Sequence, residues 1–191
     1  MLKKEIEKFY IDRYYKQAED PNSWFGSGIM NQEIAEFLLK KYNSSHKRLL
    51  LQSTETVLNF DKVNIRRINP YHLQLHKYIL MFFGLSLECL LKGFLIKIKK
   101  VTPLKNTKGN FSLSKEIKTH ALKSMYLSAF EKYDPGEEDT LERLERAVLA
   151  GKYPLESNIQ HISSYTGYFD TDIKKSKLMI KKMKNVCFPK S

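Results

Sequence analysis

The stretch Tyr78–Ile96, which reads YILMFFGLSLECLLKGFLI, is the feature that most restricts how this chain can fold. A helix that is apolar on all sides must be buried, either in a membrane or in the middle of a protein. Glu88 and Lys92 lie inside the stretch, one helical turn apart. A charged residue at the centre of a bilayer costs roughly 2.5–3.5 kcal/mol, whereas a Glu four residues before a Lys can pair along a helix in a soluble bundle. The stretch therefore predicts the central helix of a bundle, and a membrane span is the less favoured alternative.

The length and composition of the chain fit a single folded domain. The chain has 191 residues, of which 42% are hydrophobic and 12% are aromatic, and domains usually contain about 100–200 residues. The eight glycines and six prolines lie mostly between segments of helical periodicity, and no convincing alternating strand pattern is present. We expect an all-α fold, an up-down helical bundle around a long central helix at about 71–99. Residues 1–191 form one domain in this interpretation, with 1–70 as an N-terminal helical extension that packs on the bundle.

Turn-forming residues predict the boundaries of the N-terminal helices. Charged and apolar residues alternate with helical spacing over 1–19, and the segment DPNSWFGSG at 20–28 is expected to end that helix. Asn31 is then expected to cap a second helix that continues towards residue 59. A basic turn is expected over 62–70.

The C-terminal half is expected to contain a loop followed by helices. A loop is predicted over 100–118, and shorter helices are predicted over 120–133 and 136–150. Asp170 is expected to cap a final helix, whose apolar residues are interleaved with lysines. Such a basic amphipathic helix can follow a phosphate backbone or lie on an anionic membrane, and the same pattern is typical of the solvated face of a packed helix. The lysines are Lys174, Lys175, Lys177, Lys181, Lys182 and Lys184.

The charge of the chain bears on its partners. The formal net charge is +12, which suits a polyanion such as nucleic acid, although a general enrichment in surface lysine gives the same value. Cys89 and Cys187 have neither metal-ligand spacing nor the pattern of a disulfide framework, so no metal site and no cofactor are expected. The N-terminal sequence has no apolar core of a secretory signal. The interpretation is a cytoplasmic protein without membrane association.

Three short patterns contain candidate ligand-binding residues. Glu88 and Lys92 can bind a ligand beside a cleft, or can tie the central helix to its neighbours. His120, in the sequence THAL, can titrate near neutral pH or contact phosphate, or can hydrogen-bond the adjoining loop. Lys152 and Tyr153 lie in GKYP, where glycine and proline indicate the end of a helix and a rigid turn.

The order of these patterns resembles that of the HEPN family (higher eukaryotes and prokaryotes nucleotide-binding domain). SLECLLKGFL is followed by THALKSMY, by GKYP and by a closing basic helix, and residues 71–187 would form the HEPN-like core. Lys152 departs from the family, which commonly has arginine in an R-Y-P turn. The resemblance implies a homodimeric helical bundle that binds RNA or a nucleotide, in a bacterial defence or toxin–antitoxin setting.

The resemblance also suggests an enzymatic alternative. Active members of the family are metal-independent ribonucleases with an R-x(4–6)-H motif, and Arg67 and His72 match that spacing. A histidine can act as general base on a ribose hydroxyl while arginine stabilises charge on the phosphate. The family places this motif later in the domain, however, and here Pro70 interrupts it. A further alternative is a non-catalytic interaction module, in which a groove beside Glu88 and Lys92 accepts a helix of a partner protein.

Overall fold

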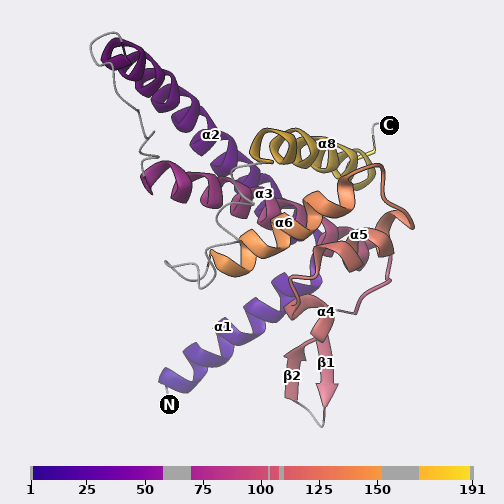
Figure 1. The fold of residues 1–191 in the computed structure, drawn as a ribbon. Coiled ribbons are helices and arrows are strands. Elements are labelled where there is room, and N and C mark those ends of the chain that lie inside the picture. The colour runs from indigo at the N-terminus through magenta and orange to yellow at the C-terminus, as the bar shows by residue number, and fades with distance from the viewer. Residues whose placement is uncertain (1, 58–69, 103, 108–109, 152–167, 190–191) are drawn as a thin grey trace.

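The computed structural model describes residues 2–57, 70–102, 104–107, 110–151 and 168–189, and Figure 1 shows their arrangement. Helices dominate, which confirms the expected all-α class. A short β-hairpin is the only sheet in the part of the chain that is described. In chain order the elements are α1 (Leu2–Glu19), α2 (Pro21–Val57), α3 (Pro70–Lys97), β1 (Leu104–Thr107), β2 (Asn110–Leu113), α4 (Lys115–Lys118), α5 (Leu122–Phe130), α6 (Glu137–Ala150) and α8 (Phe169–Cys187).

Helix α3 is the centre of the bundle, as its apolar sequence predicts. It packs against α2, α5, α6 and α8, which surround it in Figure 1. Its side chains at Ile79, Phe83, Leu87 and Leu91 are fully buried. By length and composition alone, Leu75–Lys97 is apolar enough to cross a membrane, but 72% of its most apolar window is buried inside the protein. A buried core helix of a soluble protein has this same character.

Helices α2 and α3 approach closely because glycines lie between them. A Cβ atom on Gly28 would lie 3.1 Å from the carbonyl oxygen of Ser86, whose hydroxyl donates a hydrogen bond of 2.7 Å to the carbonyl of Gly28. A Cβ atom on Gly93 would lie 2.9 Å from the carbonyl oxygen of Pro21. Gly26, by contrast, faces open space. The N-terminal half of the chain is thus joined to the central helix along a tight backbone contact.

The predicted turn over 20–28 is wrong, because α2 already begins at Pro21. Only Asp20 separates α1 from α2. Its carboxylate accepts hydrogen bonds of 3.0 Å from the backbone N–H of Asn22 and from the hydroxyl of Ser23. Proline is favoured in the first turn of a helix, where its missing N–H has no intrahelical partner. The break between the two helices is therefore a single capping residue.

Two predicted helix caps lie inside helices instead. Asn31 is in the interior of α2, where its side-chain nitrogen lies 4.0 Å from the sulfur of Cys89 on α3. Asp170 is in the first turn of α8, and Tyr168 precedes that helix as its N-cap. An acidic residue in the first turn still complements the positive end of the helix dipole.

The predicted loop over 100–118 is also wrong, because it contains the hairpin and the short helix α4. Strands β1 and β2 are antiparallel, and Leu104 pairs with Leu113 at the base of the hairpin. Figure 1 shows the hairpin projecting from the end of the bundle. The prediction failed because each strand has only four residues, which is too short for an alternating pattern to be recognised.

A buried ion pair fixes α8 on α6. Asp172 is fully buried, and its two carboxylate oxygens accept hydrogen bonds of 2.7 Å from Nε and Nη2 of Arg143. The hydroxyl of Thr140 donates a third bond of 3.0 Å. Tyr168 covers the guanidinium, with its ring centroid 4.7 Å from Cζ. Both carboxylate oxygens of Asp172 are thus hydrogen-bonded, and the ion pair joins α8 to α6.

Candidate functional site

The candidate site begins with two charged side chains on the central helix. Glu88 and Lys92 are one turn apart on α3, and each residue is only 4% exposed. Lys92 Nζ lies 2.5 Å from Glu88 Oε1. Helical spacing of i and i+4 explains why the two side chains meet. Their burial among apolar helices makes the pair unusual, because burying charges carries a desolvation cost of several kcal/mol per ion.

His120 completes the cluster from a different part of the chain. It lies in the short connection between α4 and α5, and its Nδ1 is 2.9 Å from Oε2 of Glu88. An ionised carboxylate only accepts hydrogen bonds, so a tautomer of His120 with its proton on Nδ1 can donate to Glu88 in this contact. The His120 side chain is 23% exposed, whereas that of Glu88 is 5% exposed. The histidine therefore connects the buried carboxylate to the protein surface.

Helix α2 covers another side of the cluster. The Trp24 ring centroid lies 5.5 Å from Lys92 Nζ, a cation–π contact. The indole N–H donates a hydrogen bond of 2.9 Å to the carbonyl of Ala18, which holds the ring in place. Burial raises the pKa of the adjacent Cys89 thiol to about 11, and the charge of Glu88 adds to the rise. This thiol is a neutral packing group at physiological pH, as its place in the apolar helix suggested.

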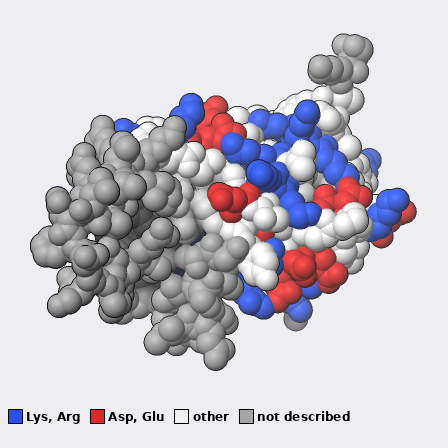
Figure 2. Space-filling view, turned by 45° about the horizontal axis from the view of Figure 1, so that its top comes forward, with Lys and Arg blue, Asp and Glu red and all other residues white. Residues whose placement is uncertain are grey.

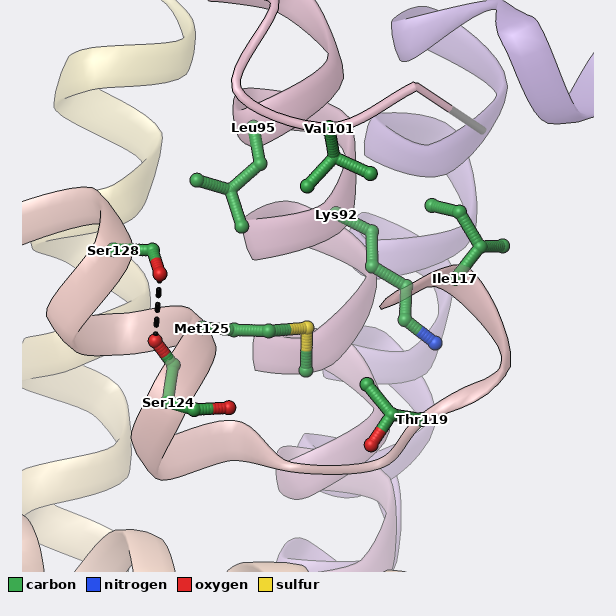
Figure 3. Close-up of a pocket in the computed structure, with 8 residues that line it drawn as sticks. All are labelled: Lys92, Leu95, Val101, Ile117, Thr119, Ser124, Met125 and Ser128. Carbon is green, nitrogen blue, oxygen red and sulfur yellow. Dashed lines mark hydrogen bonds between the residues drawn. The ribbon is translucent and has the colours of Figure 1, made fainter. Parts of the chain in front are cut away.

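A small pocket lies on the other side of Lys92, as Figure 3 shows. Its volume is about 110 Å³. The methylene chain of Lys92 runs along the pocket, and its ammonium group points toward the side formed by Ile117 and Thr119. Leu95, Val101 and Met125 supply an apolar lining. Pockets that bury drug-sized ligands measure about 300–1,000 Å³, so this one is too small to enclose a nucleotide.

The structure brings together three of the residues that the sequence singled out as ligand-binding. Glu88, Lys92 and His120 form one connected cluster. Lys152 and Tyr153 lie outside the described residues, so their predicted place beside the cluster stays a prediction. Arg67 also lies outside them, as does the side chain of His72 on α3. The ribonuclease assignment of these two residues therefore stays a prediction as well.

Sequence reasoning missed Trp24 and Thr119 as neighbours of the cluster. Trp24 lies in the segment that was predicted to be a turn, and no local signal relates it to Lys92, which is 68 positions away. Thr119 lines the pocket, and its hydroxyl accepts a hydrogen bond of 3.2 Å from the backbone N–H of Ala121. That bond shapes the turn that presents His120. The sequence THAL contained the signal, because Thr commonly forms such local turns.

The cluster offers two chemical capabilities. The Glu88 carboxylate orients the His120 ring, as carboxylates do for histidines that transfer protons or contact phosphate. Lys92 supplies a buried positive charge that Glu88 balances, so the pair holds the Glu88 carboxylate in place beside His120. Across the described part of the chain, no group of three or more His, Cys, Asp or Glu side chains is placed to hold a metal ion.

The predicted basic helix α8 has a mixed surface. Lys174, Lys177 and Lys181 are exposed. Lys182 instead lies 3.1 Å from the carboxylate of Asp134, and Lys175 donates to the carbonyl of Pro135 at 2.5 Å. Figure 2 shows Lys and Arg side chains gathered on the upper right of one face, with Asp and Glu side chains among them. Part of the lysine stripe thus has a structural role.

Comparison of the chain with family models, with curated protein sequences and with solved structures finds no significant match.

Proposed function

We propose that this protein is a HEPN-like helical bundle that binds RNA at the surface around Glu88, Lys92 and His120. The observation that supports the proposal best is the double contact of Glu88. Its two carboxylate oxygens contact Lys92 on the central helix and His120 in the THAL turn, 32 residues further along the chain. These are two of the patterns on which the resemblance depends. Their convergence in space is what a shared site requires.

The energetic cost of the cluster supports a functional role. A buried ion pair can often be replaced by apolar residues of similar volume at no loss of stability, or with a gain of about 1–4 kcal/mol. Glu88 and Lys92 lie on the central helix between fully buried apolar residues such as Leu87 and Leu91. Buried ionic groups are therefore weak evidence for stability alone. The proposal explains why ionised groups occupy this position.

RNA is a better candidate than a free nucleotide as the ligand. The pocket of about 110 Å³ is too small to enclose a nucleotide. A polynucleotide, however, is bound along a surface through its phosphates, and a net charge of +12 favours that mode. His120 is the member of the cluster that reaches the surface, so it is the residue that would meet the ligand.

The proposal is tested by measuring RNA affinity as a function of salt concentration. Fluorescence anisotropy with a labelled single-stranded RNA is the assay, applied to the wild type and to His120→Gln. Log affinity should fall linearly with log salt for the wild type, and His120→Gln should bind at least about fivefold more weakly, a loss of about 1 kcal/mol for one contact. Circular dichroism establishes that the variant is folded. Absence of binding at low ionic strength, or binding that salt does not weaken, would refute the proposal.

The same samples address the ribonuclease alternative and the homodimer that the resemblance implies. Incubation of RNA with the protein in EDTA, followed by electrophoresis, shows whether metal-independent cleavage occurs. Cleavage that is lost in His72→Ala would assign it to the Arg67–His72 motif, and cleavage that persists would reject that assignment. Light scattering, measured as the protein elutes from a size-exclusion column, shows whether its mass is that of a dimer.

A further inference from the structure

The positive charge of the chain is concentrated in two segments, one around the hairpin and one at the C-terminal end. Residues 97–123 contain eight lysines and a single acidic residue, Glu116, so this segment carries +7 of the net +12. Helix α8, over 169–187, has six lysines and two aspartates, which is a net charge of +4. A concentration of one sign of charge produces a local potential that attracts polyanions. The hairpin segment is therefore one of two strongly basic segments, the other being residues 173–191, which contain seven lysines and no acidic residue.

The fold brings the two basic flanks of the hairpin together. The antiparallel register pairs Leu104 with Leu113, so the residues before β1 and those after β2 leave the hairpin at the same end. Val101, from the first flank, and Ile117, from the second, line the same small pocket, and Figure 3 shows both side chains there. The backbone segments that carry Lys99, Lys115 and Lys118 therefore lie near one another at the base of the hairpin.

Some of these lysines already have structural partners, and others do not. Lys97 donates a hydrogen bond of 3.0 Å to the carbonyl of Cys187, and Lys100 donates one of 2.8 Å to the carbonyl of Ser128. Lys99, Lys115 and Lys118 are exposed, and none of the acidic side chains that the structure describes pairs with them. These three side chains define the hairpin-base surface, and their charge is available to a ligand.

The hairpin-base surface is continuous with the candidate site. Lys118 directly precedes Thr119 and His120, and Thr119 lines the pocket beside Lys92. A phosphate backbone that lies across the three lysines would therefore continue to the exposed edge of His120. Helix α8 meets the hairpin flank at its C-terminal end, where Lys97 bonds the carbonyl of Cys187, whereas Lys182 and Lys175 contact Asp134 and Pro135 just before α6.

We propose that Lys99, Lys115 and Lys118 at the base of the hairpin contact the phosphate backbone of the bound RNA and guide it past His120. This inference rests on the proposed function and specifies which surface carries it. A lysine ammonium binds phosphate as a point charge and does not read base edges. The contacts therefore contribute affinity that depends on salt and is independent of sequence.

The test compares two triple variants that remove equal charge from different surfaces. Lys99→Gln/Lys115→Gln/Lys118→Gln removes the hairpin-base lysines. The matched control, in which glutamine replaces Lys174, Lys177 and Lys181, removes three exposed lysines from α8. Each phosphate contact contributes about 0.7 to the slope of log affinity against log salt for single strands, so three contacts contribute about 2. The hairpin-base variant should lose this slope and bind about 100-fold more weakly at 0.1 M salt.

The outcomes separate this inference from the proposed function. The α8 control should keep a slope within about 0.5 of the wild type, because its three lysines are not among the proposed phosphate contacts. If the wild type binds RNA but the two triple variants weaken binding equally, or only the control does, the hairpin-base inference is wrong and the proposed function stands. If the wild type does not bind RNA, the proposed function itself fails. A duplex RNA and a duplex DNA of equal length, measured alongside, show whether the surface prefers single strands.

Discussion

Glu88→Gln is the substitution that most directly probes the buried cluster. It preserves the shape of the side chain but removes the negative charge between Lys92 and His120. At 2.5 Å the attraction between Glu88 and Lys92 is about 7 kcal/mol for an effective dielectric constant of 20, most of which offsets the desolvation of the two ions. The variant leaves the Lys92 ammonium buried without a counter-ion. Removing one partner of such a pair costs about 3–5 kcal/mol.

The assay is urea unfolding followed by circular dichroism, supported by thermal melting. Each kcal/mol shifts the Tm of a protein of this size by about 2–4 °C, so Glu88→Gln should lower it by about 10 °C. Lys92→Met should lower the free energy of unfolding by less than Glu88→Gln does, because Glu88 keeps its contact with His120. The double variant should be more stable than the sum of the single effects predicts, with a coupling energy of about 0.5–3 kcal/mol.

An exposed pair with the same helical spacing provides the matched control. Glu142 and Arg146 form an i, i+4 ion pair on α6 in which both side chains are 43% exposed. Glu142→Gln should change stability by no more than about 1 kcal/mol, as is usual for surface pairs. If Glu88→Gln costs no more than this control, or if the double variant shows additive effects, then Glu88 and Lys92 do not form the buried pair described here.

Three further predictions concern the packing that positions the site. Gly93→Ala should lower the free energy of unfolding in urea by about 1–3 kcal/mol, because the added Cβ would meet the backbone of α2. Gly26→Ala, at a position in open space, should raise it by about 0.4–1 kcal/mol. Equal effects of the two substitutions would contradict the close contact between α2 and α3. Asp172→Asn should lower the free energy of unfolding by about 3–5 kcal/mol. The same substitution at the neighbouring exposed residue, Asp170→Asn, should lower it by no more than about 1 kcal/mol. A mild effect at both positions would argue against the buried ion pair. Burial raises the pKa of both cysteine thiols to about 11. At pH 8 they should therefore react with a disulfide reagent about 100-fold more slowly in the native protein than in urea. Rapid reaction of the native protein would show that the thiols are not buried.

The central helix was predictable because its signal is local. A long segment that is apolar on all sides, with Glu88 and Lys92 one turn apart, indicates both burial and pairing without knowledge of the rest of the fold. The boundary between α1 and α2 was not predictable in the same way. Gly28 looks like a turn residue, but it lies inside α2, where α3 approaches its backbone too closely for a side chain. This requirement comes from the packing of α3 on α2, so it cannot be recognised in the local sequence.

The candidate site shows the same division between local and tertiary information. Glu88 and His120 were singled out separately, and the order of their motifs suggested that they belong to one site. The contact of 2.9 Å between them depends on the path of the chain through the hairpin, which the polar four-residue strands did not reveal. Trp24 could not be assigned to the site, because its contact with Lys92 follows from the packing of α2 on α3.

Photochemical cross-linking is the measurement that tests the central claim most directly. RNA containing 4-thiouridine is irradiated with the wild-type protein, and the attached peptides are identified by mass spectrometry. The proposed site predicts adducts on peptides from residues 97–123, which include His120 and the hairpin-base lysines. Adducts confined to α8, or an absence of adducts under conditions in which RNA is bound, would contradict it.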